Sequence, residues 1–306
     1  MKIIALVCAL FIFSFASDVS ATASLDVKSC AYSEQNKTLA IYDTKNSLNI
    51  LNKKDLKTIN KFDFKTDEIT SLAFEGENLY AGFSSGEIAK FSDNFSSYAS
   101  ALNLSNLSLD AQVTHLHVAN GKIYAVAGKN AFISYDLASK KLMRADLNGA
   151  YCIATCQILN STALITSWDR SVFTVNLSTM KAKNLGKLKS VALSAAEINS
   201  DVIFGLASGE IASLKFDAEA NLTQTNGKDN ASSNLTAVKN AQNKADLNLT
   251  SGKANANLTD AEIQIYKISN SRVKSLLVVQ DKVYIGLGNG EILRSDAEFK
   301  QIEKIG

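Results

Sequence analysis

Short segments in which apolar and polar residues alternate recur along most of the chain, and each is followed by a tight turn. The clearest group comprises residues 69–74, 78–83 and 86–91, where the alternation has the period of two that is typical of β-strands. We expect each such group to form consecutive strands of an antiparallel sheet. Similar segments lie at 30–32 and 38–42, 113–118 and 121–126, 153–159 and 163–166, 201–206 and 209–211, and 273–278, 282–287 and 290–293.

The segments repeat with a period of about 40 residues. The turn residue before the third strand of each unit marks the repeat, at Asn46, Gly86, Asn130, Ser171, Gly209 and Gly290. The intervals between these markers are 40, 44, 41, 38 and 81 residues. A fourth strand fits between the units, at 57–64, 183–188 and 263–268. This pattern predicts an all-β fold, a β-propeller of about six four-stranded blades, with seven blades as the alternative.

The doubled interval contains a polar, low-complexity segment. Residues 218–260 include no aromatic residue and are rich in Asn, Lys, Ala, Thr and Ser. Such a composition buries too little apolar surface to offset the entropy lost when the backbone is ordered. The segment is either an insertion between the third and fourth strands of the fifth unit or the remnant of a seventh blade. We favour the insertion, because residues 262–266 resume a strand pattern, and we expect residues 24–306 to form a single propeller domain.

The first 23 residues have the pattern of a cleaved secretory signal peptide. Lys2 precedes an almost wholly apolar run at 3–15, and small residues follow at 21–23. The run is too short to span a bilayer, and no other stretch approaches the roughly 18 apolar residues of a membrane span. We therefore expect export through a Sec-type signal, a location in the periplasm and no membrane span.

The composition narrows the classes of partner. The chain has 306 residues, of which 46% are hydrophobic and none is proline, so it can bury a sizeable core and has no proline-rich linker. Its 32 basic and 30 acidic residues give a net charge of +2. This balance argues against nucleic-acid binding, which requires a strongly basic surface.

Three cysteines follow the expected signal peptide: Cys30, Cys152 and Cys156. An odd number leaves at least one thiol outside any intrachain disulfide. On an extended strand Cys152 and Cys156 would lie roughly 13 Å apart, which is too far for a disulfide. They could bond only if the strand began after Cys152 and the chain bent there. We expect them to remain thiols or to pair between chains.

His115 and His117 are the only histidines, and together with Cys156 they are the candidate metal ligands. The two histidines point to one side of a strand. They fall on the first strand of one unit and Cys156 on the first strand of the next, so the three could begin a copper or zinc site. In our repeat alignment, however, His115 and Cys156 occupy equivalent positions and point in the same rotational direction. We therefore favour half-buried histidines, with no bound metal and no cofactor.

No catalytic motif stands out in the sequence. It contains no Gly-x-Ser-x-Gly, no His-Glu-x-x-His and no phosphate-binding glycine loop. Glu87, Glu210 and Glu291 recur at one position in three units, which is typical of a residue that solvates a turn. Trp168–Asp169 matches the dipeptide of WD repeats, but it occurs once and precedes a third strand. We predict no catalytic residues; the alternative is a propeller enzyme, a hydrolase or lyase, acting at the central channel.

Three positions match the acidic-x-Asn-x-Thr pattern of an extended bacterial N-glycosylation acceptor: Asn36, Asn221 and Asn248. Chance matches are expected in a chain rich in Asn and Thr. Asn221 and Asn248 lie within the polar segment and are the more accessible of the three.

Two repeated strands, Leu-Tyr-Ala-Gly at 79–82 and Val-Tyr-Ile-Gly at 283–286, each lead into a Gly-Glu-Ile turn. With these strands, its proline-free, Lys- and Asn-rich composition and its signal peptide, the chain resembles the periplasmic nitrate reductase accessory proteins of the NapL type, which are WD40-like propellers. The resemblance covers the mature chain and implies scaffolding, maturation or electron delivery for a periplasmic respiratory enzyme. It transfers no catalytic residue. The expected function is a non-enzymatic interaction module whose partner is a periplasmic protein, such as a nitrate reductase component.

Overall fold

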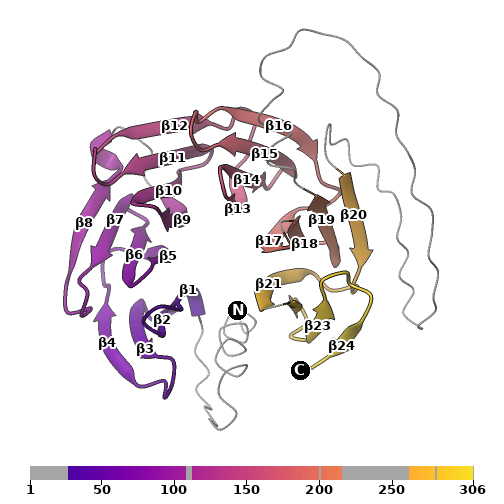
Figure 1. Ribbon diagram of the computed structural model, residues 1–306, viewed down its shortest axis with the longest axis horizontal. Helices are drawn as coiled ribbons and strands as arrows, with labels where there is room; N and C mark the ends of the chain where they lie inside the picture. Colours follow the sequence, from indigo (N-terminus) through magenta and orange to yellow (C-terminus); the bar gives the residue numbers. More distant parts are fainter. Residues whose placement is uncertain (1–26, 108–111, 200, 216–261, 280, 306) are drawn as a thin grey trace.

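The computed structural model describes residues 27–107, 112–199, 201–215, 262–279 and 281–305. These residues form six four-stranded antiparallel sheets, and Figure 1 shows the sheets following one another in chain order around a central axis. The structure therefore confirms the all-β class and the six-bladed propeller. The expected signal peptide lies outside the described residues, as does nearly all of the polar segment.

Each blade is one continuous stretch of chain that runs from its innermost to its outermost strand (Figure 1). Blade 1 contains β1 (Val27–Ser33), β2 (Thr38–Asp43), β3 (Ser47–Asn52) and β4 (Thr58–Asp63). Blade 2 contains β5 (Ile69–Glu75), β6 (Asn78–Phe83), β7 (Glu87–Phe91) and β8 (Tyr98–Asn103), followed by a single 3₁₀ turn, η1 (Ser105–Leu107). Blade 3 contains β9 (Val113–Ala119), β10 (Lys122–Ala127), β11 (Ala131–Asp136) and β12 (Leu142–Asp146).

The second half of the ring repeats this order. Blade 4 contains β13 (Ile153–Leu159), β14 (Thr162–Ser167), β15 (Ser171–Asn176) and β16 (Ala182–Lys187). Blade 5 contains β17 (Ala192–Ile198), β18 (Asp201–Leu206), β19 (Glu210–Lys215) and β20 (Glu262–Lys267). Blade 6 contains β21 (Val273–Val279), β22 (Lys282–Leu287), β23 (Ile292–Asp296) and β24 (Ile302–Lys304).

The turn before each third strand is the marker that revealed the repeat. Gly86, Gly209 and Gly290 have φ values of 88°, 79° and 95°, in the left-handed region that glycine adopts without strain. In blade 4 the equivalent residue is Arg170 (φ 76°), one position before the Ser171 that the sequence pattern suggested.

Both faces of the second strands are buried, because every blade packs against a neighbour on each side. In β18, Val202 and Phe204 belong to the apolar cluster shared with blade 4, and Ile203 belongs to the cluster shared with blade 6. One such cluster joins each successive pair of blades from 1–2 to 5–6. Within the described part of the chain, no such cluster joins blade 6 to blade 1.

A β-bulge follows the first residue of every innermost strand. The bulge directs that first residue against the second strand of the preceding blade. A Cβ atom at Gly82 would lie 2.5 Å from Val113 Cγ1, and one at Gly205 would lie 2.4 Å from Val273 Cγ1. Glycine is therefore required at these two positions by the close approach of the next blade.

The polar segment connects two strands of one sheet. β19 ends at Lys215, β20 begins at Glu262, and the two strands are paired neighbours in blade 5. This placement confirms that the segment interrupts the third and fourth strands of the fifth unit.

Deleting residues 221–258 and joining the ends through a short glycine turn should leave the propeller folded. We expect a cooperative thermal transition whose midpoint is unchanged or a few degrees higher, because each halving of the loop length lowers the entropic cost of closure by about 0.6 kcal/mol. Thermal unfolding followed by circular dichroism measures this. Aggregation of the shortened chain, or loss of the transition, would show that the deleted residues contribute to the fold.

Candidate interaction surface

Two large aromatic side chains are exposed at one end of blade 4. Tyr151 is 71% exposed and precedes β13, and Trp168 is 53% exposed in the turn between β14 and β15. The backbone N–H of Trp168 donates to the carbonyl of Cys152 (2.9 Å), so the two aromatic residues are held at the same edge of the sheet. The other exposed large apolar side chains, Ile59, Tyr98 and Ile305, lie on three different blades.

Asp169 holds the turn that presents Trp168. Its carboxylate accepts hydrogen bonds from the hydroxyls of Ser167 and Ser171 and from the ammonium of Lys187 (2.8 Å). Burial alone would raise the pKa of Asp169, but the hydrogen bonds from Lys187 and the two serines outweigh it and lower the pKa well below its usual range. Asp169 is therefore a charged anchor for the turn.

A basic side chain completes the group. Arg170 is exposed next to Trp168, and its guanidinium donates to the carbonyl of Lys189 (3.4 Å). Lys187 is paired with Asp169 and Lys189 with Glu210 (3.1 Å), whereas Arg170 has no carboxylate partner among the described residues. We call Tyr151, Trp168 and Arg170 the aromatic surface. Tyr, Trp and Arg are the residue types that dominate the energetics of protein interfaces.

The three candidate metal ligands converge differently from the repeat alignment. His115 pairs with Val126 and Thr155 with Thr166, so the residue equivalent to His115 is Thr155 and not Cys156. Cys156 therefore has the opposite orientation from Thr155 and packs in the cluster between blades 3 and 4, and His115 bonds the backbone of Ala154 across the same interface. The expectation that His115 and Cys156 point in the same direction was wrong, because the bulge displaces the alignment by one residue.

The electrostatics of these groups are those of uncharged side chains. Burial lowers the pKa of His115 to about 4 and raises the pKa of the Cys156 thiol to about 12. His115 is half-buried and His117 is exposed, with its ring 6.5 Å from that of Tyr124. No group of three or more His, Cys, Asp or Glu side chains is arranged for a metal ion within the described ranges.

The first-strand hydroxyl groups lie between blades. The hydroxyls of Ser71, Ser194 and Ser275 are buried without a described partner, each beside a residue pair that includes a glycine of the second strand. Thr155 Oγ1 lies 2.7 Å from Thr166 Oγ1, and the Thr70 hydroxyl donates to the carbonyls of Gly82 and Val113. These groups therefore stabilise the blade contacts.

The recurring glutamates bind their own turns. Glu210 accepts from Ser208 and Lys189, and Glu291 accepts from Asn289 and Lys304. Burial would raise the pKa of Glu210, but these hydrogen bonds lower it, and those from Lys304 and Asn289 lower the pKa of Glu291. The turn-solvating role predicted for the repeated acid is consistent with these bonds.

Cys30, Cys152 and Cys156 form no disulfide in the described structure. β13 does begin after Cys152, whose φ of 51° bends the chain there, so the geometric condition for a local bond is met without one forming. Among the glycosylation candidates, Asn36 donates its side-chain nitrogen to the carbonyl of Glu77 (3.5 Å), while Asn221 and Asn248 lie outside the described residues.

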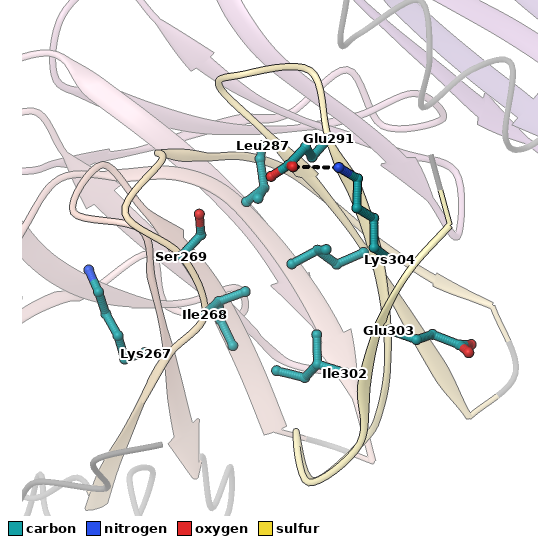
Figure 2. Close-up of a pocket in the computed structure, with 9 residues that line it drawn as sticks. Lys267, Ile268, Ser269, Leu287, Glu291, Ile302, Glu303 and Lys304 are labelled. Carbon is teal, nitrogen blue, oxygen red and sulfur yellow. Dashed lines mark hydrogen bonds and ion pairs between the residues drawn. The ribbon is translucent and has the colours of Figure 1, made fainter. Parts of the chain in front are cut away.

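A cavity of about 220 Å³ lies between blades 5 and 6. Figure 2 shows its lining residues, with Ile268 and Ile302 facing each other from β24 and from the segment after β20. The full lining comprises Lys267, Ile268, Ser269, Leu287, Glu291, Leu293, Ile302, Glu303 and Lys304. The apolar side chains form the interior, and an ion pair between Glu291 and Lys304 (2.6 Å) lies at one side.

Sequence reasoning had considered Trp168 only as part of a dipeptide and had missed Tyr151, Arg170 and the cavity. The available signal was the presence of large aromatic residues within turns, where polar residues are usual. Over the described ranges, no helix has the length and apolarity needed to cross a membrane.

The sequence matches no protein-family model and no curated protein. Solved propellers match the structure at low sequence identity. The β-propeller domain of Cps50 (Swd1) from Myceliophteria thermophila has a TM-score of 0.64 at 10% identity, covering 94% of this chain and 88% of that one. The computationally designed Ika8 protein gives 0.56 at 16% identity, covering 92% and 87%. BamB from Moraxella catarrhalis gives 0.52 at 11% identity, covering 87% and 70%.

These matches support the WD40-like β-propeller fold and do not support the resemblance to the NapL type. At such identities the likeness concerns the fold alone. The chain is, by its fold, a six-bladed WD40-like β-propeller.

Proposed function

We propose that the protein is a non-enzymatic accessory module of the periplasm that binds a protein partner through the aromatic surface. The observation that carries this proposal is the exposure of Tyr151 and Trp168 at one edge of blade 4. Exposed aromatic side chains cost solvation free energy in a monomer, and they recover it when a partner covers them. The neighbouring Arg170 can add hydrogen bonds to a carboxylate or carbonyl group of that partner.

The periplasmic location rests on the sequence pattern of residues 1–23, and the choice of partner rests on the resemblance to the NapL type. A periplasmic respiratory enzyme, with nitrate reductase as the first candidate, is therefore the partner we propose. Assistance by scaffolding, maturation or electron delivery requires a stable contact but no catalytic residue in this chain.

Replacing Trp168 by alanine should weaken binding to the periplasmic nitrate reductase of the same organism by about tenfold, because truncating an interface anchor costs more than 1 kcal/mol. Tyr151→Ala should act in the same direction. Biolayer interferometry with the tagged, exported protein measures both, and Ile59→Ala is the matched control, because Ile59 is an exposed apolar residue on another blade.

Equal binding by Trp168→Ala and the unmodified protein would contradict the assignment of the surface. Co-purification of the tagged protein tests the function itself. Recovery of no partner, combined with turnover of a small substrate, would favour the hydrolase or lyase at the central channel.

A further inference from the structure

The interface between blades 5 and 6 is less completely filled than the others. In five blades one residue after the fourth strand donates its backbone N–H to the turn before the third strand. In four of them this residue is almost fully buried: Phe64 (9% exposed), Leu104 (0%), Leu147 (0%) and Leu188 (2%). The fifth is Ile268, which donates to Gly209 (3.2 Å) and is only half-buried. The cavity lies against this side chain.

The interface between blades 1 and 2 shows what fills the same space elsewhere in the ring. There the ring of Phe64 lies 5.3 Å from that of Phe83 and 5.7 Å from that of Tyr98. Phe62 and Phe91 extend the cluster, with their ring centroids 5.2 Å apart. Aromatic rings from both blades thus close the outer part of that interface.

Strand pairing identifies the residues that replace these rings between blades 5 and 6. Leu287 pairs with the first residue of β21 as Phe83 pairs with the first residue of β5. Ile302 pairs with the second-last-but-one segment of β23 at Ser295, as Tyr98 pairs with Phe91. Ile268 stands in the place of Phe64.

The replacements remove ring volume from one position after another. Phenylalanine becomes isoleucine at 268, leucine at 287 and serine at 295, and tyrosine becomes isoleucine at 302. Three of these residues have side chains without a ring that line the cavity: Ile268, Leu287 and Ile302. The space of about 220 Å³ is therefore the volume that aromatic rings occupy between blades 1 and 2.

The size and lining suit one aromatic ring. An apolar cavity of roughly 150 Å³ lined by Leu, Ile and Phe binds benzene, so this cavity has room for a phenyl or phenol group. Its charged neighbours favour no ionic ligand: Glu291 is paired with Lys304, and Lys267 donates to the carbonyl of Ser208 (2.9 Å). In Figure 2 the Glu291–Lys304 pair lies beside the apolar side chains, where it can contact the polar backbone that carries the ring.

We propose that this cavity receives a phenylalanine or tyrosine side chain of a protein partner. The inserted ring would complete the blade 5–6 interface as Phe64 and Tyr98 complete the blade 1–2 interface. The inference rests on the proposed interaction function only for the source of the ring.

Isoleucine-methyl NMR spectra of the mature protein, titrated with N-acetyl-tyrosine amide, test the cavity without any partner. We expect saturable shifts at the methyl groups of Ile268 and Ile302, and none from N-acetyl-alanine amide. Ile302→Tyr installs the residue that blade 2 carries at this position and should weaken the binding of the amide at least tenfold. Ile59→Tyr, on the exposed face of β4, is the matched control and should leave the binding unchanged.

Ile268→Phe fills the cavity from the other side and gives a second test if Ile302→Tyr does not fold. Shifts that fail to saturate, or saturable binding that survives in a folded cavity-filling variant, would overturn the proposal. A partner that binds Ile302→Tyr as tightly as the unmodified protein would contradict the source of the ring. Loss of amide binding to the unmodified protein, with partner binding through the aromatic surface intact, would overturn the cavity and leave the proposed function standing.

Discussion

Replacing Gly205 by threonine should lower the free energy of unfolding by about 3 kcal/mol, the upper part of the range for overpacked cores. Gly205 lies in β18, where a Cβ atom would stand 2.4 Å from Val273 Cγ1 and 2.5 Å from Ser194 Oγ. Neither neighbour can withdraw easily, because Val273 is fully buried at the start of blade 6 and Ser194 lies on the innermost strand of blade 5. Urea unfolding followed by fluorescence measures the change.

The protein contains its own control for this substitution. In blade 4 the equivalent residue is Thr166, whose hydroxyl lies 2.7 Å from that of Thr155, and the next blade presents the small Ala192 in place of a valine. Adding Ser194→Thr and Val273→Ala to the Gly205→Thr chain reproduces this arrangement and should recover most of the lost stability. A Gly205→Thr protein as stable as the original would refute the steric account.

Lowering the pH from 6.5 to 4 should destabilise the protein partly through His115. The pKa of this imidazole is about 4 in the folded protein, because it is desolvated between blades 3 and 4, and about 6.5 in the unfolded chain. The unfolded state therefore takes up the proton first. The contribution of His115 is complete above pH 6.5 and is lost as the pH falls toward 4. The full shift corresponds to about 3 kcal/mol, and the partial contact of the ring with water reduces our expectation to about 2 kcal/mol.

His115→Ser isolates this contribution, since serine occupies the equivalent position in blades 2, 5 and 6. The difference in unfolding free energy between pH 7 and pH 4 should be about 2 kcal/mol smaller in the variant. The carboxylates that titrate in this range are common to both proteins and cancel in the comparison. Identical pH profiles for the two proteins would contradict the assignment.

The fold could be predicted from the sequence because each strand buries alternate residues and each turn needs a particular backbone conformation. Gly86, Gly209 and Gly290 marked the turns, and residues 263–268 marked the fourth strand of blade 5 despite the long interruption. The orientation of Cys156 could not be predicted in the same way. A β-bulge adds one residue without changing the apolar pattern, and a shift of one residue turns a side chain to the opposite face.

The candidate sites were harder to predict than the fold. The exposure of Tyr151 and Trp168 depends on how the ends of blade 4 are arranged, which no local pattern records. The cavity depends on two blades at once. Replacing Phe by Ile or Leu leaves an apolar pattern unchanged, so the lost ring volume becomes visible only when the interfaces are compared in space.

β19 and β20 are paired along six register positions although residues 216–261 lie between them in the chain. A single backbone cut in that connection would divide the protein into two fragments, one ending in the third strand of blade 5 and the other beginning with its fourth. Neither fragment contains a complete fifth sheet, and the exposed edge of β19 is the surface that β20 completes. The propeller therefore has a natural site for splitting into two complementary halves, which could be fused to separate proteins and used to report when those proteins meet.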